Sequence, residues 1–207
     1  MLLAYLLLMT TPPFVAATQS AYVQQDADRL RTLFDQAETR ADSLLVRYRL
    51  YPLTEDPEVL DGIPTSLTDG TAREYALLSG LWAYRAGEGS FLSAIRYGKR
   101  STHLLERARS LDPNAPFVLL VEGQSLLFRP AIAGRDPAGA ADCFSALAEI
   151  VSENDVSGIS RTAAEIWQWL ALGEAGRTEE AESLWQQLRT QDLPPLYQQF
   201  LDDPPEV

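Results

Sequence analysis

The stretch GRTEEA at residues 176–181, followed by Trp185 and Leu188, decides the fold of this chain. Its glycine permits a tight turn, and the two glutamates that follow suit the first turn of a helix, where acidic side chains interact favourably with the helix dipole. Ala181, Trp185 and Leu188 are spaced four and three residues apart, so they lie on one helix face. The stretch therefore predicts a helix that starts at a turn and packs through one apolar face.

The same spacing recurs along the chain and predicts helices without any strand. Residues 19–50 predict one long amphipathic helix. Residues 52–70 are rich in Pro, Gly, Asp and Thr, which predicts a long loop. Further helices are predicted at residues 71–85, 91–111, 115–128, 137–151, 162–174 and 178–190, about seven in all, with a short capping segment at 194–201.

Capping residues mark several of these boundaries. Thr71 and Glu74 have the spacing of a capping box, in which each side chain accepts a hydrogen bond from a free backbone N–H group. Asn114 is expected to cap the helix that starts at residue 115. Asp136 precedes Pro137, which places a capping carboxylate before a proline at the first helical position.

Residues 71–188 resemble tetratricopeptide (TPR) repeats, whose second helix carries a small residue, an aromatic residue four positions later, and a small or apolar residue three positions after that. The small residue allows two helices to approach closely, and the large one fills the groove between hairpins. The matching triplets are Ala181, Trp185 and Leu188; Ala140, Phe144 and Leu147; Ser101, Leu105 and Ala108; and Leu30, Phe34 and Ala37.

The resemblance implies an all-α fold: a TPR-like stack of antiparallel helix hairpins in a right-handed superhelical array. This chain departs from the 34-residue TPR period, because residues 87–95 and 129–136 add length between the helices of two hairpins.

The first 17 residues, MLLAYLLLMTTPPFVAA, predict an export signal. Small residues at Val15 and Ala17 are spaced as signal peptidase requires, and the apolar run before them falls short of the 18 to 20 or so residues that a membrane-spanning helix needs. We therefore expect residues 18–207 to form a single TPR-like α-helical domain in the periplasm, with no membrane span after the signal is removed.

Charge and composition narrow the range of partners and chemistry. The net charge of -12 argues against nucleic acid and against an anionic membrane surface. His103 and Cys143 are the single histidine and cysteine of the chain, too few for a His/Cys zinc site and without a motif for a nucleophile. Glu179 and Glu180 are explained by the helix dipole. The sequence therefore predicts no enzyme, no metal and no cofactor.

In TPR arrays the first helix of each hairpin faces a groove that holds the partner, and the corresponding positions here are mostly apolar. One alternative is that the groove binds an apolar or amphipathic segment; the other is that the helices of this short array fill it. The predicted groove residues are Phe117, Leu120, Gln124, Leu127, Phe128, Arg129, Ala163, Ile166, Trp167 and Leu170.

Two arginines flank the long turn after this helix. Arg129 and Arg135 could accept an acidic group, with Tyr84 and Tyr97 nearby, or they could serve only the turn. The sequence leaves both readings open.

The leading hypothesis is a non-enzymatic, exported TPR-like protein that scaffolds a protein partner in the bacterial cell envelope. The alternative is a periplasmic binding component that holds a hydrophobic small ligand for a transport system. Repeat arrays often associate through an exposed terminal face, so a homo-oligomer is a further open alternative.

Overall fold

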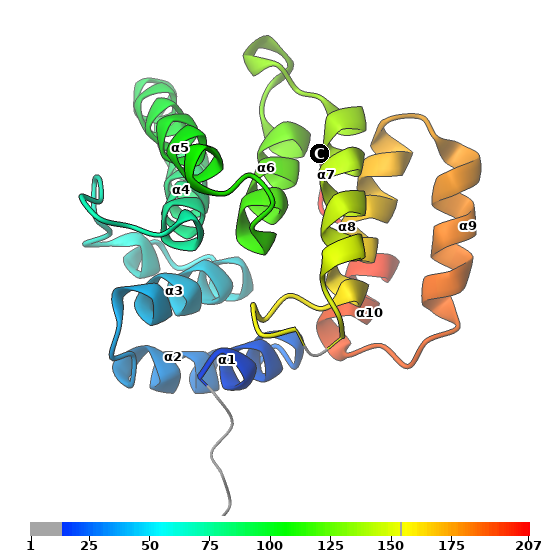
Figure 1. The fold of residues 1–207 in the computed structure, drawn as a ribbon, viewed down its shortest axis with the longest axis horizontal. Coiled ribbons are helices and arrows are strands. Elements are labelled where there is room, and N and C mark those ends of the chain that lie inside the picture. The colour runs from blue at the N-terminus through cyan, green and yellow to red at the C-terminus, as the bar shows by residue number, and fades with distance from the viewer. Residues whose placement is uncertain (1–13, 154) are drawn as a thin grey trace, which may run out of the picture.

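The computed structural model describes residues 14–153 and 155–207, and these residues form α-helices, two short 3-10 helices and connecting loops, with no strand among them. Figure 1 shows the arrangement. The helices are α1 (Phe14–Val23), α2 (Ala27–Asp35), α3 (Arg40–Thr54), η1 (Pro57–Leu60), α4 (Ala72–Gly87), α5 (Phe91–Leu111), α6 (Pro116–Phe128), η2 (Ala131–Ala133), α7 (Pro137–Ile150), α8 (Arg161–Glu174), α9 (Thr178–Arg189) and α10 (Pro195–Asp202).

Local capping sets several helix ends, as the sequence predicts. Thr71 accepts a hydrogen bond from the backbone N–H of Glu74, and the Glu74 carboxylate accepts one from the backbone N–H of Thr71, which completes the capping box. Asp136 caps α7 by accepting from Gly139 N at 3.0 Å, with Pro137 at the first helical position. The bounds predicted for α5 are also confirmed.

The prediction of one helix over residues 19–50 is wrong, and so is the total of about seven helices. The chain breaks at Gln25, whose φ of 57° lies in the left-handed region, and Asp26 then caps α2 by accepting from Arg29 N. Thr39 caps α3 in the same way. The apolar spacing runs through both breaks because α1, α2 and α3 each bury one face. Periodicity alone therefore merges helices that capping residues separate.

Asn114 does not cap α6, contrary to the prediction. Its backbone N–H donates instead to Asp112 Oδ1 at 3.0 Å, so residues 112–114 form a turn. Ala115 occupies the N-cap position without a side-chain hydrogen bond, and Pro116 is the first helical residue.

The region 52–70 contains the end of α3 and the short helix η1, and the rest is a loop tied to α4. Tyr75 donates to Leu67 O at 2.8 Å, and Trp82 Nε1 donates to Pro64 O at 2.9 Å. These bonds hold the loop against one side of α4.

Successive helices run in opposite directions and pack side by side from α4 to α9 (Figure 1). Helices α1 to α3 lie across the lower ends of the first helices of this row in Figure 1, and α3 packs against α4. Helix α10 returns to contact both α8 and α1, where Gln19 Nε2 donates to Tyr197 Oη at 3.0 Å. The two ends of the described chain are therefore joined through α1 and α10.

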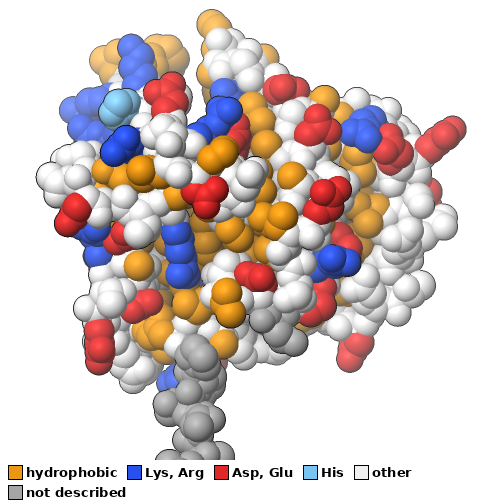
Figure 2. All heavy atoms as spheres, in the orientation of Figure 1, with side chains coloured by type: hydrophobic (Ala, Val, Ile, Leu, Met, Phe, Trp, Pro, Cys, Tyr) orange, Lys and Arg blue, Asp and Glu red, His pale blue; other side chains and the backbone are white. Residues whose placement is uncertain are grey.

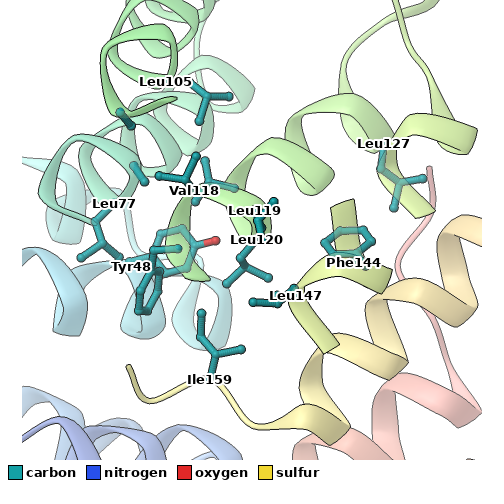
Figure 3. Close-up of a cluster of buried hydrophobic side chains, with 14 of the residues drawn as sticks. Tyr48, Leu77, Leu105, Val118, Leu119, Leu120, Leu127, Phe144, Leu147 and Ile159 are labelled. Carbon is teal, nitrogen blue, oxygen red and sulfur yellow. The ribbon is translucent and has the colours of Figure 1, made fainter. Parts of the chain in front are cut away.

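Two aromatic rings lie directly on glycines at helix crossings. Phe144 of α7 is fully buried, and a Cβ atom added at Gly123 of α6 would lie 2.6 Å from its ring. Tyr48 of α3 covers Gly80 of α4 in the same manner. Figure 3 shows Tyr48 and Phe144 in the buried cluster that joins these helices. The glycines allow a closer approach of the backbones than any other residue would.

Arg49 of α3 is buried next to this cluster, with 4% of its surface exposed. Its guanidinium donates to Gly158 O in the loop before α8 and lies 5.6 Å from the Tyr22 ring centroid. Burial lowers the pKa of Arg49 to about 10, and burial raises the pKa of Tyr22 to about 12. Arg49 thus joins α1, α3 and the 151–160 loop in the interior.

The predicted export signal falls largely outside the described residues, since residues 1–13 are not among them. Residues 14–17 form the first turn of α1, and Phe14 and Ala17 pack against the cluster that includes Leu30 and Leu50. Within residues 14–153 and 155–207, no helix is long and apolar enough to cross a membrane.

Removal of residues 14–17 is predicted to weaken the packing of α1. A chain that begins at Thr18 loses the apolar contacts of Phe14 and Val15 and the hydrogen bond from Thr18 Oγ1 to Phe14 O. We expect its free energy of unfolding in urea to be lower by about 1–3 kcal/mol than that of a chain that begins at Phe14. Equal unfolding midpoints for the two chains would show that these contacts do not stabilise the fold.

A pair of glycine substitutions tests the close helix approach. Gly123→Ala pushes a methyl group into the Phe144 ring, which Trp167 backs from the other side, so the free energy of unfolding should fall by about 1–3 kcal/mol. Gly173→Ala in α8 meets nothing within 4 Å, so it should raise that free energy by about 0.5–1 kcal/mol. Urea denaturation followed by circular dichroism measures both, and effects of the same sign would contradict the packing.

Candidate functional site

Helices α4 and α5 form a surface hollow of about 320 Å³ with the loop that precedes α4. The helices supply aromatic rings and arginines, and the loop supplies the opposite wall. The lining residues are Gly62, Ile63, Trp82, Arg85, Arg96, Tyr97 and Arg100.

Aromatic rings position the arginines of the hollow. Trp82 is buried and packs on Tyr97, with ring centroids 5.2 Å apart. The Arg100 guanidinium carbon lies 4.5 Å from the Trp82 ring centroid, and that of Arg96 lies 4.9 Å from the Tyr97 centroid. These cation–π contacts hold both guanidinium groups over aromatic rings, and Arg96 also donates one N–H group to Tyr97 Oη.

The hollow is a positive site on an acidic protein. Arg85 is paired with Asp61 at 3.2 Å, whereas Arg96 and Arg100 form no ion pair with any described residue. Helix α5 carries five arginines and lysines against the single acidic residue Glu106, although the whole chain has a net charge of -12. Figure 2 shows these basic side chains gathered around the single histidine at the upper left. Basic charge is therefore concentrated on one helix.

The pKa of Tyr97 is lowered by the neighbouring arginines. Arg96 donates a hydrogen bond to Tyr97 Oη at 3.1 Å, and Arg85 lies 6.0 Å from the ring centroid. The bond from Arg96, with the nearby charge of Arg85, lowers the pKa of Tyr97 below its ordinary value because both stabilise the phenolate. Burial raises the pKa of Tyr48, Tyr51 and Tyr84, so Tyr97 differs from them in direction.

Large apolar side chains are exposed in the first turn of α5 and in η2. Phe91 and Leu92, in the first turn of α5, are 79% and 76% exposed, and Ile132 in η2 is 98% exposed. Both segments lie at the helix ends that point away from α1 to α3 (Figure 1). Leu92, Arg96 and Arg100 follow one another at four-residue intervals, which places an apolar side chain and two free cations in one row along α5.

The predicted groove is filled by the protein itself in the described residues. Trp167 stacks on Phe144 with centroids 5.8 Å apart, and Phe200 of α10 meets its ring edge-on at 4.8 Å. Phe128 contacts the same indole at 6.0 Å and is the most exposed apolar side chain of the predicted set. The predicted residues buried in the core are Phe117, Leu120, Leu127, Ile166 and Leu170.

The polar side chains of the predicted site form hydrogen bonds and an ion pair within the protein itself. Gln124 accepts a hydrogen bond from Tyr48 Oη, and Arg129 Nε donates to Ser125 O in its own helix at 2.9 Å. Arg135 donates to Leu127 O at 3.1 Å and is paired with Glu174.

The two tyrosines expected near these arginines lie elsewhere. Tyr84 stacks on Tyr51 with centroids 4.8 Å apart, and Tyr97 lines the α4–α5 hollow. That expectation from the sequence is therefore wrong.

Neither potential nucleophile or base lies in a reactive arrangement. Cys143 is half-buried, and burial together with the nearby carboxylate of Glu122 raises the pKa of its thiol to about 11, so it is protonated at neutral pH. His103 is exposed on α5, with Nδ1 3.9 Å from Glu106 Oε2. Among the described residues, no three His, Cys, Asp or Glu side chains are grouped as a metal site would require.

Sequence reasoning missed the α4–α5 hollow, although one signal was present. The segment 91–111 contains five basic residues and one acidic residue, which departs from the charge of the rest of the chain. What the pattern does not show is that Trp82 and the loop at residues 62–63 come together beside it.

Comparison with protein-family models, with curated proteins and with solved structures finds no match to this chain. The class that the geometry defines is thus an all-helical protein with a basic, aromatic hollow, and the TPR resemblance rests on the residue triplets alone.

A tyrosine titration tests the electrostatics of the hollow. We expect the tyrosine absorbance at 295 nm to show one component that ionises below pH 10, because the arginines stabilise the Tyr97 phenolate. Tyr97→Phe should remove this component, and Arg96→Gln should shift it to higher pH. A titration that is unchanged in Tyr97→Phe would contradict the assignment.

Proposed function

We propose that this protein is a non-enzymatic, exported, TPR-like helical protein that scaffolds a protein partner in the bacterial cell envelope. The observation that carries the proposal is the exposure of Phe91, Leu92 and Ile132 at the same end of two neighbouring hairpins. Exposed apolar side chains that gather beside a polar rim are typical of protein-binding surfaces. We define these three residues as the hairpin-end surface.

The TPR-like character is supported by the burial of two complete triplets, Ala140, Phe144 and Leu147 on α7 and Ser101, Leu105 and Ala108 on α5. Helix α7 packs between α6 and α8. A small residue beside a large one is what the spacing of stacked hairpins requires. We propose that the hairpins continue this arrangement as a right-handed superhelical array.

The two segments that lengthen the repeat support a binding role for the hairpin-end surface. Residues 87–95 contain Phe91 and Leu92, and residues 129–136 contain Ile132. Both additions therefore place large apolar side chains in solvent, where they contribute nothing to the core. A partner that covers them would remove this apolar surface from water.

The alternative of a hydrophobic small ligand has weaker support. The groove proposed to hold it contains five core side chains and the Trp167 cluster, and α10 covers that cluster through Phe200. A lipophilic dye should accordingly gain no fluorescence in the presence of the folded protein.

Site-specific photo-cross-linking tests the proposed partner surface. We expect a photoreactive benzoylphenylalanine at position 91 to form one dominant protein adduct in envelope extract of the source organism, and the same adduct to form from position 132. Position 156 is the matched control, because Val156 is 92% exposed in the loop at the opposite ends of the helices. Adducts of equal yield from all three positions, or none from 91 and 132, would contradict the proposal.

A further inference from the structure

We propose that the α4–α5 hollow binds side-chain carboxylates of an acidic protein segment, and that an apolar residue of the same segment rests on Leu92. This inference rests on the proposed function and adds the chemistry of the partner. It concerns the arginines of the hollow, whereas the proposed function concerns Phe91, Leu92 and Ile132.

The geometry of the arginines suits a carboxylate. The guanidinium carbon of Arg100 lies over the Trp82 ring and that of Arg96 over the Tyr97 ring, and Arg96 also donates to Tyr97 Oη, so both groups are held in place. Fixed guanidinium groups lose little freedom when their edges bind a planar carboxylate through two N–H groups. The ligand therefore meets two cations that are already oriented.

No carboxylate of the described chain occupies this position. Asp61 is the acidic residue beside the hollow, and it pairs with Arg85 at 3.2 Å while Arg85 also donates to Leu60 O. Arg96 and Arg100 are without an acidic partner among the described residues. The two unpaired cations leave the hollow complementary to an external anion.

The charge distribution favours a protein segment over an anionic membrane. An extended negative surface acts on the whole molecule, whose net charge of -12 opposes the approach. A short acidic segment is governed by the charges within a screening distance of about 8–10 Å, and near the hollow these include Arg96, Lys99 and Arg100. The positive charges near the hollow therefore attract a short acidic segment, whereas the net negative charge of the whole protein repels an extended anionic membrane surface.

The row of side chains along α5 sets the spacing of the ligand. Leu92, Arg96 and Arg100 are four residues apart, which corresponds to about 6 Å between successive positions on a helix. An apolar residue on Leu92 is thus followed by carboxylates one and two turns away. A helical segment with a leucine and glutamates at four-residue intervals matches this row.

The probe is a fluorescein-labelled peptide, Leu-Ala-Ala-Ala-Glu-Ala-Ala-Ala-Glu, titrated with the full chain and followed by anisotropy. We expect saturable binding that weakens about tenfold in each of Arg96→Gln and Arg100→Gln, since one charge-assisted hydrogen bond of this kind accounts for about that factor. Binding should raise the pKa of Tyr97, because the carboxylates offset the arginine charge.

Matched controls separate the hollow from general charge. Arg31→Gln removes the same charge from α2 and should bind the peptide as the unchanged protein does. A peptide with glutamine in place of both glutamates should bind at least about tenfold more weakly. Equal binding by the Arg96, Arg100 and Arg31 variants would overturn the proposal.

Other anions and a second copy of the chain are further outcomes that would overturn it. Each counts against the proposal when the peptide does not bind. The first is a shift of the Tyr97 titration by phosphate or acetate, and the second is arginine-dependent recruitment to phosphatidylglycerol vesicles. The third is a dimer that dissociates in Arg100→Gln. The adduct from position 132 distinguishes the two proposals: if it forms in both the unchanged protein and Arg96→Gln while the unchanged protein does not bind the peptide, the protein-partner function stands and the acidic ligand does not.

Discussion

The helix spacing of this protein depends on aromatic rings that lie directly on glycines. Gly123 has no side chain between α6 and the Phe144 ring, so α7 approaches α6 closely, and Phe144 then presents its other face to Trp167 of α8. Tyr48 on Gly80 does the same for α3 and α4. Each contact fixes the position of one helix relative to the next, because a ring that is packed on both sides cannot move without opening a cavity.

This packing buries most of the apolar side chains that the sequence assigned to a groove. Trp167 lies among Phe128, Phe144 and Phe200, which come from three other helices. The predicted groove positions thus contribute to the core, whereas Phe91 and Leu92 in α5 and Ile132 in η2 remain exposed. In the α4–α5 hollow, Trp82 and Tyr97 also hold arginines, because Arg100 and Arg96 lie over their rings without an acidic partner among the described residues.

Individual residues show which features of the structure the sequence predicted and which it did not. Thr71 and Asp136 predicted their helix starts because a cap is a contact between residues three positions apart. Asn114 failed as a cap because Asp112 accepts its backbone N–H, a competition that residue type does not reveal. Phe117, Leu120 and Leu127 were predicted as groove residues from the TPR resemblance, which left open whether the groove was open or filled, and the structure buries all three. Arg96, Tyr97 and Arg100 were not predicted to meet Trp82, because that contact joins two helices.

The sequence by itself determined the helical class and most helix boundaries, because caps, prolines and three-to-four-residue spacing act over a few residues along the chain. Tertiary structure alone decided which faces remained exposed. The α4–α5 hollow joins side chains from residues 62–63, 82–85 and 96–100, and Arg49 meets Gly158 across 109 positions of sequence. Such contacts depend on the relative placement of helices, which burial and close packing across the whole molecule settle together and no local pattern encodes.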